Sequence, residues 1–277
     1  MFDTMTTHSQ LPQAIQQPLI DERRSLRFLR KLYSFHHAQR FEWLRKKIAS
    51  LEKQSVSILE VGCSDARSLD YVPVRVDRYF GFDAGWRSGL QNGRACGLAA
   101  ARERYGYRNN FTFVQSVSYT DIKRVPEKFD LAIVMETFEY LDTHQLESYV
   151  GTLAEKIEVD GCVFATMPNE KGLPLLIKAI GSKLSGVRRS EYTLPQFLNA
   201  LAGRLDRVPR AERGRKGFDY SQIAALARRY FPYVYLEAVG SPGLPAFLSP
   251  NIGLIASHKP MVWDARKAAA PMDRVIR

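Results

Sequence analysis

The segment SVSILEVGCSDARSL, residues 55–69, is the strongest indication of how this chain folds. An apolar run rises to an acid, Glu60, and a single glycine, Gly62, is followed by the small residues 63–66. A strand that ends in such a turn is typical of an open parallel sheet, in which the ligand lies beyond the carboxyl ends of the strands. A side chain at Gly62 would push that ligand away, and the small residues let backbone amides face it.

Strand and helix patterns alternate on both sides of this segment. We expect strands at 56–61, 79–83, 111–115, 129–135, 161–167, 232–239 and 251–257. Between them we expect a short helix that ends near Pro73, helices over 86–105, 143–158 and 219–230, and a polar loop after 115. The alternation predicts an α/β, Rossmann-like fold whose mostly parallel, seven-stranded sheet carries helices on both faces.

The remaining segments flank or interrupt this pattern. Residues 1–20 are polar and are expected to be flexible, and 21–53 form an amphipathic helical cap of one or two helices. Residues 170–217 are predicted to form a helical insertion after the fifth strand, which makes a basic lid over the sheet's edge. Residues 259–277 are predicted to form a flexible basic tail. We therefore predict a single domain over 21–258.

Composition narrows the class of protein. The 277 residues are 45% hydrophobic, enough for a packed core. The N-terminus does not read as a secretory signal, and no apolar run reaches the roughly 18 residues of a membrane span. Three widely spaced cysteines, Cys63, Cys96 and Cys162, argue against a disulfide framework and a metal cluster. We predict a reduced, cytoplasmic protein without a metal site.

The net charge of +11 is concentrated in one part of the chain. Residues 171–230 hold thirteen Lys or Arg and four acids, a net charge of 13 − 4 = +9. A local excess of this kind selects anionic partners. No helix-turn-helix, zinc-finger or RNA-binding motif accompanies it, so nucleic acid is the less favoured partner.

Residues 173–187 add an apolar helical face to this basic region. Its members are Leu173, Leu176, Ile177, Ile180, Leu184 and Val187. The usual meaning of such a face is packing on a core, and its alternative is peripheral contact with an anionic membrane or a lipid-linked substrate. The sequence leaves both interpretations open.

Two kinds of ligand use a turn like that of residues 62–67. A dinucleotide favours glycine at its first, third and sixth positions, which here are Gly62, Ser64 and Arg67. Glu60 would repel a pyrophosphate but suits a ligand that carries an ammonium and a sulfonium. Asp83 follows Gly62 by 21 residues, a spacing at which a carboxylate accepts hydrogen bonds from ribose hydroxyls of either ligand.

Four segments together resemble one protein family. ILEVGCSDAR, YFGFDAG, FDLAIVMETFEYL and IEVDGCVFATMPN are similar, in order and spacing, to the landmarks of class I S-adenosylmethionine-dependent methyltransferases, in the broad methyltransferase-11 and type-12-like group. The resemblance covers about residues 55–169. It implies S-adenosylmethionine as cofactor and methyl transfer by in-line displacement, with no metal required.

The resemblance also implies positions in the cofactor site. Glu60, Gly62, Cys63 and Ser64 correspond to the turn near the methionine part, Asp83 and Ala84 to the ribose, Ser116 and Val117 to the adenine, and Met135 and Glu136 to the far side of the methionine part. Arg40 is either solvated or pairs with the cofactor's carboxylate.

Some residues depart from the family pattern. Ser64 and Ala66 replace glycines, so we expect contact with the cofactor only if both avoid strained backbone angles, and Tyr140 replaces a histidine. His36, His37 and Glu136 are the candidate catalytic residues. Each has an ordinary alternative, a solvated helix face for the histidines and core packing for Glu136.

The methyl acceptor follows least directly from the sequence. The resemblance and the basic insertion favour oxygen, with nitrogen second, on an anionic small molecule, a glycan or a lipid-linked saccharide of bacterial polysaccharide biosynthesis. An RNA methyltransferase and an inactive, cofactor-binding partner protein are the alternatives.

Overall fold

The computed structural model describes residues 27–86, 88–91, 94–184, 192–211, 214–240 and 243–261. The segment 1–20 and nearly all of 259–277, for which we expected flexibility, lie outside the described residues. The main elements are α1 (Arg27–Ala49), β1 (Ser55–Val61), β2 (Arg75–Asp83), β3 (Gly89–Gln91), β4 (Arg94–Cys96), α2 (Leu98–Tyr105), β5 (Phe111–Gln115), α3 (Tyr119–Arg124), β6 (Phe129–Met135), α4 (Thr143–Lys156), β7 (Ile157–Pro168), α5 (Gly172–Leu184), α6 (Leu194–Leu201), α7 (Tyr220–Ala227), β8 (Tyr233–Ala238) and β9 (Asn251–Ser257). Short 3₁₀ helices are η1 (Arg67–Tyr71), η2 (Phe138–Tyr140), η3 (Leu205–Arg207) and η4 (Ala246–Leu248).

Seven strands form one sheet in the order β5-β2-β1-β6-β7-β9-β8. The first five strands in that order are parallel, whereas β9 runs antiparallel to both of its neighbours, β7 and β8. This arrangement confirms the predicted Rossmann-like, mostly parallel seven-stranded sheet. The chain turns from one half of the sheet to the other between β1 and β6, and ligands of open α/β sheets bind at such a point.

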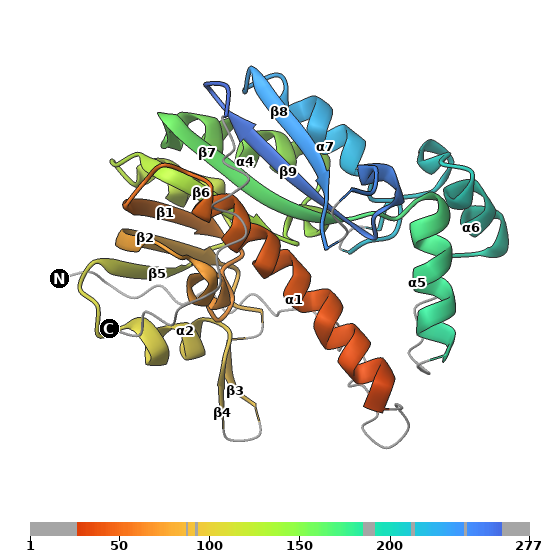
Figure 1. Cartoon of the computed structure of the whole chain (residues 1–277), viewed down its shortest axis with the longest axis horizontal. Coiled ribbons are helices and arrows are strands. Elements are labelled where there is room, and N and C mark those ends of the chain that lie inside the picture. Colours follow the sequence, from red (N-terminus) through yellow and green to blue (C-terminus); the bar gives the residue numbers. More distant parts are fainter. Residues whose placement is uncertain are drawn as a thin grey trace, which may run out of the picture.

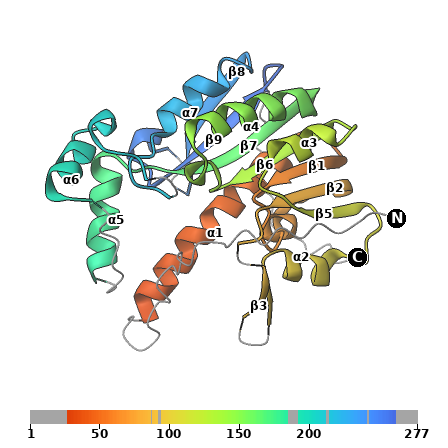
Figure 2. The ribbon, with the colours of Figure 1, turned by 180° about the vertical axis from the view of Figure 1, so that it is seen from behind.

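Helices cover both faces of the sheet (Figures 1 and 2). On one face α3, α4 and α7 bury an apolar cluster that includes Leu59, Val61 and Val134. On the other, α1, α2 and the η1 region pack on alternate residues of the same strands, such as Ile58 and Ile133. Burial on both faces explains why the strands read as nearly continuous apolar runs.

Helix α1 is a single helix in the described part of the predicted cap. Its C-terminal half packs on the sheet through Trp43, whose ring meets Phe164 edge-on at 6.0 Å and lies so close to Gly253 that a Cβ there would be 2.4 Å from the indole. Its N-terminal half leaves the sheet and projects on the same side as α5 (Figure 1). The cap therefore borders the carboxyl ends of the strands.

The prediction of a helix over 86–105 is wrong for the first half of that range. The chain forms the antiparallel ribbon β3–β4 there, and only Leu98–Tyr105 is helical. Two residues, Asn92 and Gly93, separate the two strands, and this dipeptide is the strongest short hairpin signal. The predicted polar loop after 115 also contains a helix, α3, capped by the Ser118 side chain.

The insertion after β7 carries α5, α6 and η3 around a small apolar cluster of its own. Leu175, Ala200, Leu205 and Val208 are buried in this cluster. The chain then returns to the sheet at α7, which is capped by Asp219, whose carboxylate accepts a hydrogen bond from the Ser221 amide at 2.9 Å.

Candidate functional site

The turn after β1 has the backbone path of a glycine-rich loop. Gly62, Ser64 and Ala66 have φ of 76°, 49° and 53°. Both non-glycine residues therefore adopt the left-handed conformation at a cost on the order of 1 kcal/mol each. The unstrained angles that we set as a condition for cofactor contact are not met, although the backbone keeps the path that glycines would give it. Strain of this kind persists only where the surroundings hold it in place.

Gly62 is also required by the packing of the chain itself. A Cβ at this position would lie 2.1 Å from the Oγ1 of Thr137, in the loop after β6. That hydroxyl is positioned by the Val61 and Met135 carbonyls, to which it lies at hydrogen-bond distance, 3.2 Å from each. The glycine therefore allows the turns after β1 and β6 to pack against each other at the switch point.

Glu60 lies behind the turn, on the α1 side of the sheet. It is 3% exposed, and its Oε2 accepts hydrogen bonds from the Ser68 hydroxyl at 2.5 Å and the Tyr79 hydroxyl at 2.6 Å. Burial raises the pKa of Glu60 to about 7. Neither hydroxyl partner was predicted, although both occupy positions close to the motif. These contacts hold the Glu60 carboxyl under the turn, where it links η1 to β2.

The raised pKa of Glu60 predicts a pH-dependent stability. An unfolded glutamate loses its proton near its model value of 4.5, whereas the folded protein keeps it to about pH 7, so stability falls as pH rises through this window. Glu60→Gln removes the charged form. We expect the free energy of unfolding of the wild type, relative to the variant, to fall by about 2 to 3 kcal/mol between about pH 5 and about pH 8. Urea unfolding across this range tests it, with the exposed Glu103→Gln as control, and parallel pH curves for wild type and Glu60→Gln would contradict it.

Asp83 joins the ends of β1 and β2. Its Oδ2 accepts from the Ser64 amide at 2.9 Å, and its Oδ1 accepts from the Gly85 amide at 2.7 Å. Ala84 lies between these contacts. Two backbone donors fix the carboxylate at the carboxyl end of its strand, and each oxygen retains a lone pair for a further donor.

The loop after β5 lies beside this carboxylate. The Ser116 amide donates to the Asp83 carbonyl at 2.9 Å, while the Ser116 hydroxyl donates to the Asp121 side chain at 2.7 Å. Val117 is 65% exposed. Ser116 thus organises the start of α3, and Val117 offers an apolar surface next to the Asp83 turn.

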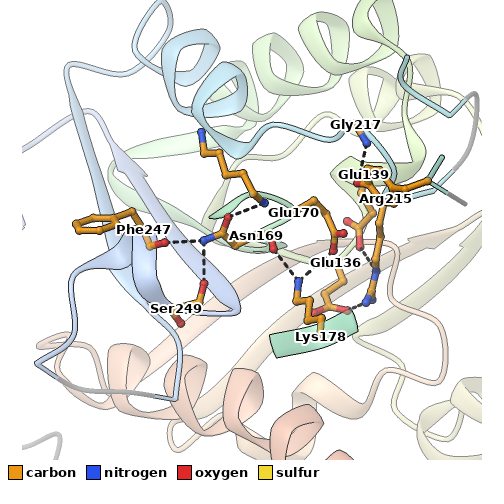
Figure 3. A network of polar contacts seen from close by, with 11 residues as sticks. Glu136, Glu139, Asn169, Glu170, Lys178, Arg215, Gly217, Phe247 and Ser249 are labelled. Carbon is orange, nitrogen blue, oxygen red and sulfur yellow. Dashed lines mark hydrogen bonds and ion pairs between the residues drawn. The ribbon is translucent and has the colours of Figure 1, made fainter. Parts of the chain in front are cut away.

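Glu136, at the end of β6, connects three parts of the chain. Its Oε2 pairs with Arg40 of α1 at 3.0 Å. It also pairs with Arg215 of the segment after η3 at 2.6 Å (Figure 3). Its own φ is 50°, a third left-handed non-glycine residue at the carboxyl ends of the strands. The salt bridges hold the cap and the insertion against the sheet.

Glu139 is a buried acid that the sequence did not single out for this role. Its side chain is fully buried and neither carboxyl oxygen has a hydrogen-bond partner in the described part of the chain, although the Arg215 Nε lies 3.7 Å from Oε1 (Figure 3). Burial, and then the nearby Glu136, raise the pKa of Glu139. Arg215 therefore lies between two carboxyl groups.

Arg215 belongs to the basic lid predicted over 170–217, but it does not face the solvent. Only 27% of its side chain is exposed, and its charge is balanced by Glu136 and Glu139. Lys178 of α5 is likewise directed inward, toward Glu170 at 3.0 Å and the Asn169 carbonyl at 3.0 Å. Two of the insertion's cations are thus structural.

Three other predicted residues have a more limited place in the site. Met135 is buried beside Thr166 at the end of β6. Cys63 is buried, and burial raises the pKa of its thiol, so its thiolate is disfavoured. Tyr140, which stands where the family has histidine, packs edge-on against Trp86 at 6.3 Å. Within the described residues no three His, Cys, Asp or Glu side chains are grouped for a metal.

The chain is similar to solved structures of methyltransferases. The methyltransferase domain of bacterial CtHen1 aligns with a TM-score of 0.52 at 17% identity over 80% of this chain and 98% of that one. A Nostoc punctiforme protein described as an O-methyltransferase aligns with a TM-score of 0.50 at 11% identity over 83% and 58% of the two chains. The chain has a class I methyltransferase fold. No family model and no curated protein sequence matches it.

Within this methyltransferase fold, the structure brings together two sets of predicted residues. Gly62, Ser64 and Asp83 meet at the ends of β1 and β2, and Arg40 meets Glu136 at the end of β6. His36 and His37 lie on the projecting half of α1, and their side chains lie outside the described residues. The methyltransferase fold thus places a carboxylate-lined turn next to a charged cluster.

Proposed function

We propose that the protein is an S-adenosylmethionine-dependent methyltransferase. The observation that carries the proposal is the Asp83 carboxylate, held between the Ser64 and Gly85 amides at the end of β2, one strand from the point where the strand order reverses. A ribose with two vicinal hydroxyls is the ligand group that such a carboxylate recognises. The pyrophosphate of a dinucleotide is disfavoured because the third and sixth positions of the turn are Ser64 and Arg67 in place of glycines.

The residues present fit this cofactor. Asp83 has lone pairs for the ribose, the exposed Val117 can lie against the adenine, and the left-handed turn at Gly62 and Ser64 would hold the methionine part. The Nε of Arg40 has no hydrogen-bond acceptor among the described residues. The Arg40 guanidinium therefore keeps donor capacity for the cofactor's carboxylate beside its salt bridge to Glu136.

The bound cofactor supplies a methyl group already activated by its sulfonium. The tasks left to the chain are to align the acceptor, exclude water and receive a proton from an acceptor hydroxyl. Glu136 is engaged by Arg40 and Arg215, so we assign it the positioning of these two guanidinium groups. His36 and His37, on the part of α1 that borders the strand ends, remain our candidates for the proton acceptor.

The acceptor we propose is an oxygen of an anionic small molecule, a glycan or a lipid-linked saccharide, used in bacterial polysaccharide biosynthesis at the cytoplasmic side. The net charge of +9 over 171–230 supports an anionic acceptor. Because Arg215 and Lys178 are paired internally, the attraction must come from other cations, such as the exposed Arg204 and Arg207.

Asp83→Ala tests the cofactor assignment. Hydrogen bonds to a charged acceptor contribute about 1.5 to 3 kcal/mol each, so we expect S-adenosylmethionine to bind at least about tenfold more weakly. Titration calorimetry measures the affinity, with the exposed Asp77→Ala on the same strand as a control expected to bind like wild type. A folded Asp83→Ala variant that binds within twofold of wild type, or a wild type that binds a dinucleotide and no S-adenosylmethionine, overturns the proposal.

A further inference from the structure

Helix α5 turns its apolar face to the outside. Leu173, Ile177 and Ile180 follow one another at i, i+4 and i+7 and are 53%, 52% and 52% exposed. Half of each large aliphatic side chain is therefore in contact with water. The interpretation of these three residues as a face that packs on the core is wrong.

The inner side of α5 shows why the helix cannot simply rotate to bury this face. Leu175 is buried against α6 and η3, and Lys178 makes its ion pair with Glu170, a residue that is itself buried (Figure 3). Turning the helix would expose Leu175 and break an ion pair in a low-dielectric environment, which costs several kcal/mol. The apolar face is thus fixed in its outward orientation.

Exposed apolar side chains also occur on α6 and near η4, two elements that contact α5. Leu194 and Leu198 of α6 are 71% and 57% exposed, and Leu244 and Phe247, in and next to η4, are 49% and 61% exposed. These four and the three residues of α5 make up seven of the thirteen large apolar side chains exposed in the described part of the chain. A concentration of this kind marks an interaction surface.

The charge near this surface identifies the partner. Arg204 and Arg207 lie in and next to η3, which packs on α6, and both are exposed without an ion pair among the described residues. The surrounding sequence 171–230 has a net charge of +9. Apolar side chains flanked by cations match the interface of an anionic lipid bilayer, because the apolar side chains insert among the acyl chains and the cations pair with the headgroups.

We propose that Leu173, Ile177 and Ile180, with the exposed leucines of α6, dock the protein on the surface of an anionic bilayer. The contact that we propose is peripheral. Among the described ranges, no helix is long and apolar enough to span a membrane. Helix α5 follows β7 directly and lies on the same side as the projecting half of α1 (Figure 1). Docking would therefore bring the carboxyl ends of the strands to the membrane, where a lipid-linked acceptor is found, a consequence that rests on the proposed function.

Vesicle co-sedimentation tests the docking by itself. We expect the wild type to bind phosphatidylcholine vesicles that contain phosphatidylglycerol, and Ile177→Asp/Ile180→Asp to bind them at least about tenfold more weakly, because the variant puts two negative charges into the apolar contact. Val159→Asp is the matched control, since Val159 is 54% exposed on β7. The control should bind like wild type, and raised salt should weaken the wild type.

Three results would overturn the proposal. They are equal binding of the double variant and the wild type, wild-type binding that is the same without phosphatidylglycerol, and a wild-type dimer that the double variant converts to monomer, which would assign the face to a second copy of the chain. Far-ultraviolet circular dichroism checks that the Ile177→Asp/Ile180→Asp variant is folded. If it is unfolded, Ile177→Ser/Ile180→Ser replaces it, and we expect this variant to show a smaller loss of vesicle binding. S-adenosylmethionine binding, measured on the same samples, separates failure of docking from failure of the proposed function.

Discussion

Arg215→Ala is expected to lower the free energy of unfolding by about 3 kcal/mol. The substitution leaves the buried Glu139 without its nearest cation and Glu136 with Arg40 as its partner, and removing one member of a buried ion pair costs about 3 to 5 kcal/mol. We take the lower end because 27% of the Arg215 side chain is exposed. Urea denaturation measures the loss.

Two further variants show whether this loss comes from the carboxyl groups. Lys216→Ala, next in the chain and without an ion pair among the described residues, should change stability by less than about 0.5 kcal/mol. Glu139→Gln added to Arg215→Ala should recover part of the loss, because a buried amide needs neither a nearby cation nor the uptake of a proton on folding. Equal effects of Arg215→Ala and Lys216→Ala, or no recovery in the double variant, would show that Arg215 is an ordinary surface residue.

Gly62→Ala is expected to be at least as damaging. At a φ of 76° an alanine costs about 1 to 2 kcal/mol through its backbone alone, and its Cβ would lie 2.1 Å from the Thr137 Oγ1, so the two loops must also move apart. We expect a total loss of about 3 kcal/mol or more and a marked loss of S-adenosylmethionine binding, because the turn that faces the cofactor shifts. Thermal unfolding and calorimetry measure the two effects.

Gly203 offers a matched control for the cost of the left-handed backbone conformation alone. Gly203 has a φ of 75°, and a Cβ added there meets nothing within 4 Å, so Gly203→Ala should cost only about 1 to 2 kcal/mol and leave cofactor binding unchanged. Thr137→Ala combined with Gly62→Ala should cost less than the sum of the single changes. If Gly62→Ala is no worse than Gly203→Ala, the close packing of the two turns is not what requires the glycine.

Much of the sheet could be predicted from the sequence because its strands are buried on both faces. The strands Phe111–Gln115, Phe129–Met135 and Asn251–Ser257 begin and end at the expected residues. The β3–β4 ribbon was missed because helix-like composition over 86–105 outweighed the short turn signal at Asn92 and Gly93. Local patterns identify long buried strands more reliably than short exposed ones.

Only the residues of the site that belong to short sequence motifs could be predicted from the sequence. Gly62 and Asp83 lie in motifs that can be read from neighbouring residues. The pairing of Glu136 with Arg215 joins residues 79 positions apart and depends on how the insertion folds back. Similarly, periodicity showed that Leu173, Ile177 and Ile180 share a face of α5, but the orientation of that face is set by the buried pair of Lys178 and Glu170.

The position of β9 in the sheet affects how the protein can be synthesised. Strand β9 is the last strand in the described part of the chain, all seven of its residues are buried, and it separates β7 from β8. During translation β7 therefore keeps an unpaired apolar edge until residues 251–257 leave the ribosome, about 80 residues after β7 itself. At 5 to 20 residues per second this interval lasts roughly 4 to 16 seconds, in which the nascent chain is most open to edge-to-edge association and to chaperone binding.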